Sequence, residues 1–128
     1  KKLHKDMNNL LLVFLGGGLG SVSRYLLGNI FHRNLLSTIP WHTLLANILA
    51  SAILGFLSAF LLLKPGQFEQ QRLLLGVGFC GGLSTFSTFT LETFELFREG
   101  NYFIALAYIF LSLIACLLAF WAAWLLQK

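Results

Sequence analysis

The segment from Gly78 to Glu92 reads GFCGGLSTFSTFTLE, and it raises the main structural question in this chain. It lies in an apolar run long enough to cross a membrane, yet it combines clustered glycines with five hydroxyl side chains. Each glycine costs a helix about 1 kcal/mol relative to alanine. In lipid, an unwound backbone costs several kcal/mol for each unpaired group. A helix break at this point is therefore expected to be buried in protein or to line an aqueous path.

The composition indicates an integral membrane protein with an all-α fold. The chain has 128 residues, of which 57% are hydrophobic and only 11% are charged, whereas a soluble domain carries about 25% charged residues. The mean hydropathy is +0.77. The net charge of +4 comes from basic residues scattered at the ends of apolar runs. These residues form no basic face, so no nucleic-acid partner is expected.

Four apolar runs predict a single four-span membrane domain covering residues 1–128. The expected spans are approximately 9–31, 41–63, 71–97 and 101–126, and each reaches or nearly reaches the roughly 20 residues that a spanning helix needs. Short segments that contain proline, glycine or charged residues connect the runs. Trp41, Tyr102, Trp121 and Trp124 lie near run ends, where interfacial aromatic residues gather in membrane proteins.

The charges near the span ends favour cytoplasmic termini. Four spans place both termini on the same side of the membrane. Six basic residues then share that side and three share the other, which is a modest bias under the positive-inside rule. The first group is Lys1, Lys2, Lys5, Lys64, Arg72 and Lys128, and the second is Arg24, Arg33 and Arg98.

Small residues recur at one-turn spacing in the first two runs. Gly16 and Gly20 form a GxxxG pair, with Gly28 on the same face two turns later, and Ser51, Gly55 and Ala59 repeat the spacing in the second run. Helix faces that carry only small side chains allow two helix backbones to approach closely in lipid. A four-helix protomer of this size has little interior of its own, so these faces predict a dimer as well as a bundle.

The segment 76–92 supports two interpretations. A broken third helix would aim backbone carbonyl and amide groups at an ion. Alternatively, the helix is only kinked and its hydroxyls bond back to their own carbonyls. Phe86 and Phe89 are three residues apart and therefore share a face. They pack in lipid or protein, or they present positive ring edges to a small anion.

The remaining candidates are isolated polar residues within apolar runs. Asn47 either clasps another helix or donates its amide protons to an anion. Tyr108 and Ser112 form one polar stripe in the fourth run, four residues apart. Arg24 either snorkels to the interface or draws anions to a vestibule. Glu92 closes the third run and is expected at a vestibule near the interface at that end of the span.

At these residues the sequence resembles the Fluc family of fluoride channels over nearly its whole length. The matching segments are GGGLGSVSRYLLGN, TLLANILASAILGFL, GFCGGLSTFSTFTLE and GNYFIALAYIFLS. The resemblance implies an antiparallel, dual-topology homodimer with two pores. It implies that Phe86 and Phe89 line each pore and that Asn47 donates to fluoride. It places Ser87, Thr88, Tyr108 and Ser112 along the polar path, and a structural sodium ion on the backbone carbonyls of Gly81 and Ser84.

Two positions depart from the family pattern. The family commonly has Gly-Thr-Leu before the second-span asparagine, where this chain has His42-Thr43-Leu44. The first threonine of the glycine-rich segment is replaced by Ser84.

The sequence therefore predicts a passive fluoride-selective channel, not an enzyme, in the inner (plasma) membrane as a multi-pass protein. It would export cytoplasmic fluoride and relieve fluoride toxicity. The sequence contains no nucleotide-binding motif, and no acidic residue lies in the middle of a span. Nothing in it therefore indicates energy coupling. The alternatives are a proton-coupled small multidrug exporter, which would carry a glutamate in the first span, and a non-transporting accessory membrane subunit.

Overall fold

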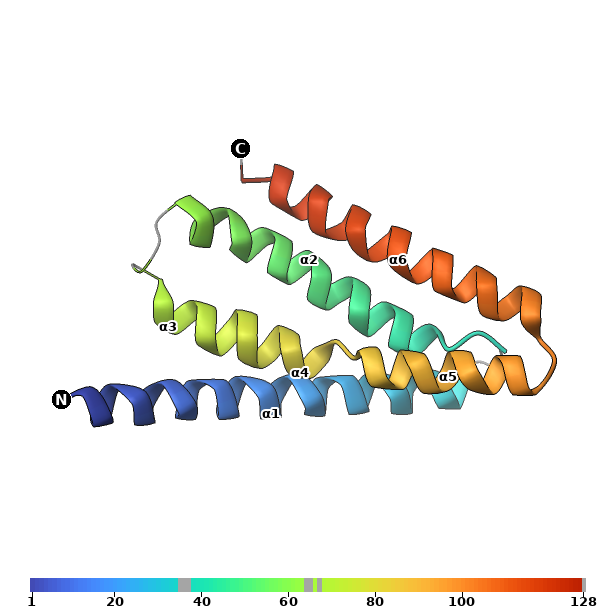
Figure 1. Cartoon of the computed structure of the whole chain (residues 1–128), viewed down its shortest axis with the longest axis horizontal. Coiled ribbons are helices and arrows are strands. Elements are labelled where there is room, and N and C mark those ends of the chain that lie inside the picture. The colour runs from blue at the N-terminus through green and yellow to red at the C-terminus, as the bar shows by residue number, and fades with distance from the viewer. Residues whose placement is uncertain (35–37, 64–65, 67, 128) are drawn as a thin grey trace.

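The computed structural model describes residues 1–34, 38–63, 66 and 68–127, and within these ranges it is helical with no strand (Figure 1). Three long helices are unbroken. The third membrane segment is divided into four shorter pieces, one of which is a π-helix. In chain order the elements are α1 (Lys2–Asn34), α2 (Trp41–Leu63), α3 (Glu69–Gln71), the π-helix η1 (Arg72–Cys80), α4 (Gly81–Leu83), α5 (Phe86–Arg98) and α6 (Tyr102–Leu125).

Among the described residues, four helical stretches are long and apolar enough to cross a membrane, which confirms the all-α, four-span prediction. They are Lys2–Phe31, Trp41–Ser58, Glu69–Arg98 and Tyr102–Leu125. The first helix begins at Lys2 rather than near residue 9, where the apolar run begins. Hydropathy marks only the part of a helix suited to lipid, and no proline or glycine stops the helix in the polar residues before that part.

The helices pack as two pairs that meet along the third segment. The helix α2 lies along α6, and α1 lies along η1 and α4. The helix α5 continues from the second pair and contacts α6. Both ends of the chain lie at the same end of the bundle (Figure 1). This arrangement agrees with the prediction that both termini share one side of the membrane.

Glycines allow the backbones of α1 and the third segment to touch. A methyl group at Gly16 would collide with the carbonyl oxygen of Leu74, and one at Gly20 would collide with that of Phe79. A methyl group at Gly18, by contrast, would meet nothing within 4 Å. The GxxxG pair thus serves a close helix contact within the protomer, as its spacing predicts.

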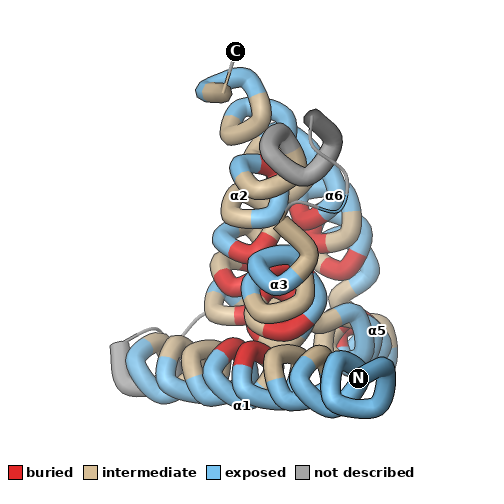
Figure 2. The backbone as a smooth tube through the Cα atoms, turned by 90° about the vertical axis from the view of Figure 1, so that its left-hand side faces the viewer, coloured by how far each residue is buried: buried red, intermediate tan, exposed pale blue. Residues whose placement is uncertain are grey.

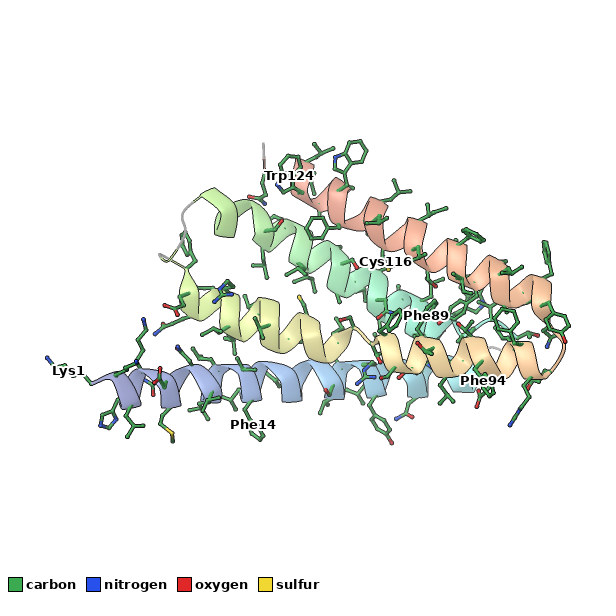
Figure 3. The ribbon with its side chains drawn as sticks, viewed as in Figure 1. Lys1, Phe14, Phe89, Phe94, Cys116 and Trp124 are labelled. Atoms are coloured by element: carbon green, nitrogen blue, oxygen red, sulfur yellow. The ribbon has the colours of Figure 1, made fainter. Side chains whose placement is uncertain are left out.

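The protein interior is small. Among the described residues, buried apolar side chains form two clusters, one of Leu44, Leu96, Ala105 and Tyr108 and the other of Ala46, Ala50, Cys80 and Leu83. Few residues of the helices are buried (Figure 2), and Phe14 points away from the bundle with 74% of its surface free (Figure 3). An apolar surface of this extent needs lipid or another protein chain to cover it.

Candidate functional site

The third segment leaves the helical conformation at two residues. Ser84 has φ −76° and ψ 156°, and Thr85 has φ −154° and ψ 123°, so both are extended between the end of α4 and the start of α5. The Thr85 hydroxyl accepts a hydrogen bond from the backbone N–H of Thr88 at 3.2 Å. Thr85 is therefore the N-cap of α5, because its side chain satisfies an amide that has no partner within the helix.

Asn47 pairs with both backbone groups of Thr85. Its Oδ1 accepts from the Thr85 N–H at 2.7 Å, and its Nδ2 donates to the Thr85 carbonyl at 3.2 Å. The helix α2 thereby supplies the hydrogen bonds that the extended residue lost when the helix ended. The amide group has two N–H donors, and the bond to Thr85 uses one of them.

Other hydroxyls near this point bond back to their own helices. The Ser84 hydroxyl donates to the Cys80 carbonyl at 2.7 Å, and the Thr90 hydroxyl donates to the Phe86 carbonyl at 2.9 Å. These two contacts match the back-bonding interpretation of the sequence. Thr85 and Thr88 instead bond to each other through their hydroxyls at 3.1 Å.

A hollow of about 310 Å³ opens beside the extended residues. Its lining residues come from α2, the third segment and α6: Asn47, Ser51, Ser84, Thr85, Phe86, Phe89, Ser112, Leu113, Cys116 and Leu117. The Ser112 hydroxyl is buried and makes no hydrogen bond with any residue that the structure describes. The hollow thus joins a free polar group with the Asn47 amide and two phenyl rings.

Three aromatic rings form a row along this side of α5. The centroids of Phe86 and Phe89 are 5.7 Å apart with their planes at 36°, and those of Phe89 and Tyr108 are 5.2 Å apart at 47°. Phe89 lies in the space between α5 and α6 (Figure 3). Phe86 leaves 78% of its surface exposed. The row therefore runs from the buried Tyr108 to the open side of the hollow.

Glu92 is held by three side chains. Its Oε1 accepts from the Thr43 hydroxyl at 2.7 Å and lies 3.3 Å from His42 Nε2, while its Oε2 accepts from the Tyr108 hydroxyl at 2.9 Å. Only 13% of the Glu92 side chain is exposed. Glu92 lies two turns before the end of α5 rather than closing the span, and Tyr108 links it to the aromatic row.

Arg24 reaches from α1 to the same region. Its Nε donates to the Gly82 carbonyl at 3.2 Å and its Nη1 to the Thr88 hydroxyl at 3.4 Å. It also lines a cavity of about 410 Å³ together with His42 and Thr43. A second cavity of about 380 Å³ is lined by His42, Thr88 and Glu92, among others. The two expected vestibule residues, Arg24 and Glu92, thus lie on neighbouring cavities that share His42 and Thr88.

The structure brings most of the sequence-predicted site residues together and leaves two at the margin. The hollow unites Asn47, Phe86, Phe89 and Ser112, and the Glu92 cluster unites Glu92 with Tyr108. Ser87 is exposed, with its hydroxyl 3.3 Å from that of Thr85. Gly81 is also exposed, and a methyl group there would meet nothing within 4 Å.

Sequence reasoning missed Thr43 and His42 as members of the site, and it counted Thr85 only among the five hydroxyl side chains of Gly78–Glu92. Thr43 and Asn47 are four residues apart and therefore share a face of α2. The same four-residue spacing linked Tyr108 and Ser112 in the fourth run. Applied to the second run, it would have placed Thr43 beside the polar path.

The fold and site define a class: a multi-pass, all-helical membrane protein with a polar cluster and an aromatic row beside an interruption in its third span. Comparison of the sequence with known families then identifies the family within that class. Residues 11–124 match the model of the family described as "CrcB-like protein, Camphor Resistance (CrcB)". The chain belongs to this family and is a multi-pass plasma membrane protein.

Curated relatives share much of the sequence over nearly its whole length. A Pyrococcus furiosus protein is 42% identical over 123 residues, which cover 96% of this chain and 98% of that protein. A Leptospira interrogans protein is 42% identical over 121 residues, covering 94% and 95%, and a Coxiella burnetii protein is 40% identical over 121 residues, covering 94% and 98%. Each of these relatives is named "Fluoride-specific ion channel FluC".

Proposed function

We propose that this protein is a passive, fluoride-selective ion channel and has no enzymatic activity. The observation that carries the proposal is the hollow beside Ser84 and Thr85, which combines an amide donor, an unpaired buried hydroxyl and two phenyl rings. The names of the family's relatives agree with this chemistry. They also favour a channel over the multidrug exporter and the accessory subunit.

The proposed path follows the polar and aromatic groups. Fluoride enters from the cavities that Arg24 and Glu92 line and passes Thr88 and Tyr108. It then crosses the edges of Phe86 and Phe89, where the positive rim of each ring faces the anion. Asn47 and Ser112 donate hydrogen bonds in the hollow, which replace part of the water that the ion loses. A lysine in this position would hold the ion more tightly, whereas these neutral donors let it leave.

Export through such a channel needs only a gradient. Hydrogen fluoride is a weak acid that crosses the membrane in its neutral form from an acidic exterior and ionises in the cytoplasm. The anion then leaves through the channel, which relieves fluoride toxicity without energy coupling.

A fluoride efflux assay tests the function directly. Liposomes that contain only the purified protein are loaded with potassium fluoride and diluted into fluoride-free buffer. Valinomycin lets potassium leave with the anion so that charge stays balanced, and efflux is followed with a fluoride electrode. We expect rapid fluoride efflux without a proton gradient and little chloride efflux in the parallel assay. An exporter would require the proton gradient, and an accessory subunit would match protein-free liposomes.

The proposed channel is an antiparallel, dual-topology homodimer with two pores, in which the third span is a broken transmembrane helix. Phe86 lines the hollow yet is 78% exposed, which supports a second copy that covers the open side. The charge bias of six basic residues against three would orient every copy alike. Three of the favoured six lie within the first five residues, however, so the bias depends heavily on one short segment.

Cysteine labelling tests the topology. Cys80 and Cys116 are replaced and a single cysteine is appended at the C-terminus. We expect an impermeant reagent to label about half the copies in intact cells, because dual topology exposes each terminus on both sides. A variant that lacks the N-terminal lysines should give the same fraction. Labelling of nearly all or nearly none would reject dual topology and indicate a partner of opposite orientation.

A structural sodium ion is proposed on the carbonyls of Gly81 and Ser84 from both protomers. The N–H of Thr85, four residues after Gly81, donates to Asn47 Oδ1, and the N–H of Thr88, four residues after Ser84, donates to the Thr85 hydroxyl. Both carbonyls therefore lack their usual helical donor at the negative end of α4. Half-helix C-terminal ends of this kind coordinate sodium in other membrane proteins, and the open surface at Gly81 would allow two copies to meet.

Replacing sodium tests this site. Exchange of sodium for N-methyl-D-glucamine at constant ionic strength should lower the dimer's thermal midpoint in detergent, because the carbonyl cage would lose its cation. The Ser84→Ala variant should keep the same dependence on sodium, since its carbonyl is the proposed ligand and its hydroxyl already bonds to Cys80. Equal thermal midpoints in the two salts would exclude a structural sodium ion from the proposed dimer.

A further inference from the structure

His42 is a titratable group at the edge of the proposed path whose role the family resemblance does not supply. Its Nε2 lies 3.3 Å from Glu92 Oε1, and 22% of its side chain is exposed. It lines both cavities beside the site, one with Arg24 and the other with Glu92. A methyl group placed at Gly28 would lie 3.8 Å from the His42 ring, so α1 closes over one side of the ring.

A chain of contacts connects His42 to the aromatic row. His42 faces Glu92 Oε1, Glu92 Oε2 accepts from the Tyr108 hydroxyl, and the Tyr108 ring packs on Phe89. The Glu92 carboxylate therefore lies between the 380 Å³ cavity and the hollow. A negative charge at that position repels an anion that moves from one to the other.

We infer that His42 sets the charge that a permeating anion meets at Glu92. When the ring is protonated, the pair of His42 and Glu92 is neutral, and when the ring is neutral, the carboxylate charge is uncompensated. Imidazole titrates between about pH 5 and 8, whereas fluoride stays ionised over this range. Fluoride conduction therefore rises as the pH falls through it. This inference rests on the proposed channel function.

Other ionisable groups face His42 from each neighbouring helix. Glu92, Glu95 and Glu99 of α5 line the cavity of 380 Å³ with it, and Arg24 and Tyr25 of α1 line the cavity of 410 Å³. Tyr108 of α6 reaches it through Glu92. The glutamates carry the other negative charges beside His42, so they need their own control.

Fluoride efflux is measured with equal pH inside and outside the liposomes, from about pH 8 to about pH 5.5, after subtraction of protein-free efflux. We expect wild-type flux to rise about fivefold over this range, because electrostatic steering responds strongly to one charge in a confined mouth. The His42→Gln variant keeps a hydrogen-bond donor but no charge, so its flux should be independent of pH. His42→Lys is charged throughout and should show high flux at both ends of the range.

Three further variants identify the partner and exclude other sources of the effect. Glu92→Gln should raise the flux at about pH 8 to the level that the wild type reaches only in acid, since the negative charge that His42 neutralises is gone. His4→Gln, at the far end of α1, and the double variant Glu95→Gln with Glu99→Gln should keep the pH dependence of the wild type. Each variant is first checked for a single dimer peak by size-exclusion chromatography.

Several outcomes would overturn the inference. One is wild-type flux that is flat or falls with acidification, and another is an equal rise in His42→Gln. These results leave the channel proposal intact, because flux is present. A well-folded wild-type protein without flux at any pH would overturn the proposed function and, with it, the role of His42.

Discussion

Replacing Asn47 with aspartate is expected to reduce fluoride flux about a hundredfold, which corresponds to ~2.7 kcal/mol of added barrier. The aspartate would still accept from the Thr85 N–H, but it would set a carboxylate oxygen against the Thr85 carbonyl, where the Asn47 Nδ2 now donates at 3.2 Å. It would also place a negative charge in the hollow that the anion is proposed to cross. Both effects act against conduction.

Asn47→Ala separates the two effects. It leaves the Thr85 N–H and carbonyl unpaired but adds no charge, so we expect a loss of about tenfold, which corresponds to ~1.4 kcal/mol. Asn101→Asp, which makes the same chemical change near the start of α6, should conduct as the wild type does. The measurement is efflux from liposomes at matched protein density. If Asn47→Asp conducts as well as the wild type, Asn47 does not contact the anion and serves only as a clasp for Thr85.

The sequence predicts the gross architecture because membrane insertion depends on local properties. The uncharged fourth run, Tyr102 to Leu126, and the run from Trp41 to Leu63 are long enough to span a bilayer by their own composition. Their positions as α6 and α2 follow without knowledge of any tertiary contact. The GxxxG spacing likewise predicts that Gly16 and Gly20 face another helix, because the period of the helix decides which residues share a face.

The site is less predictable because its contacts join distant parts of the chain. No local pattern shows that Asn47 reaches Thr85, which lies 38 residues away, or that Thr43 reaches Glu92, which lies 49 residues away. The glycines of the third segment predict a weak helix, but no local pattern predicts that Arg72–Cys80 is π-helical and lies against α1. From the sequence, His42 is only a residue near the end of a span. Its contact with Glu92 is known only from the structure.

Replacing Phe86 and Phe89 with isoleucine is expected to reduce flux at least about tenfold for each residue, or ~1.4 kcal/mol of added barrier. Isoleucine keeps an apolar side chain but lacks the ring quadrupole whose positive edge is proposed to face the anion. Phe89→Ile should have the larger effect, since it also removes the ring whose centroid lies 5.2 Å from that of Tyr108. That packing helps to hold Tyr108 in place as a hydrogen-bond donor to Glu92. Phe86 is largely exposed in the protomer, so its loss should leave the protomer fold intact.

A phenylalanine on the same helix provides the control. Phe94 lies on α5 with 60% of its surface exposed and is not among the residues that line the hollow. Phe94→Ile makes the identical chemical change two turns away from Phe86 and should conduct as the wild type does. Flux is compared for variants that give the same dimer peak, so a loss cannot arise from unfolding. Wild-type flux in the Phe86→Ile, Phe89→Ile double variant would exclude the ring edges as part of the anion path, and selectivity would then depend on the polar groups of the proposed path, Asn47 and Ser112 among them.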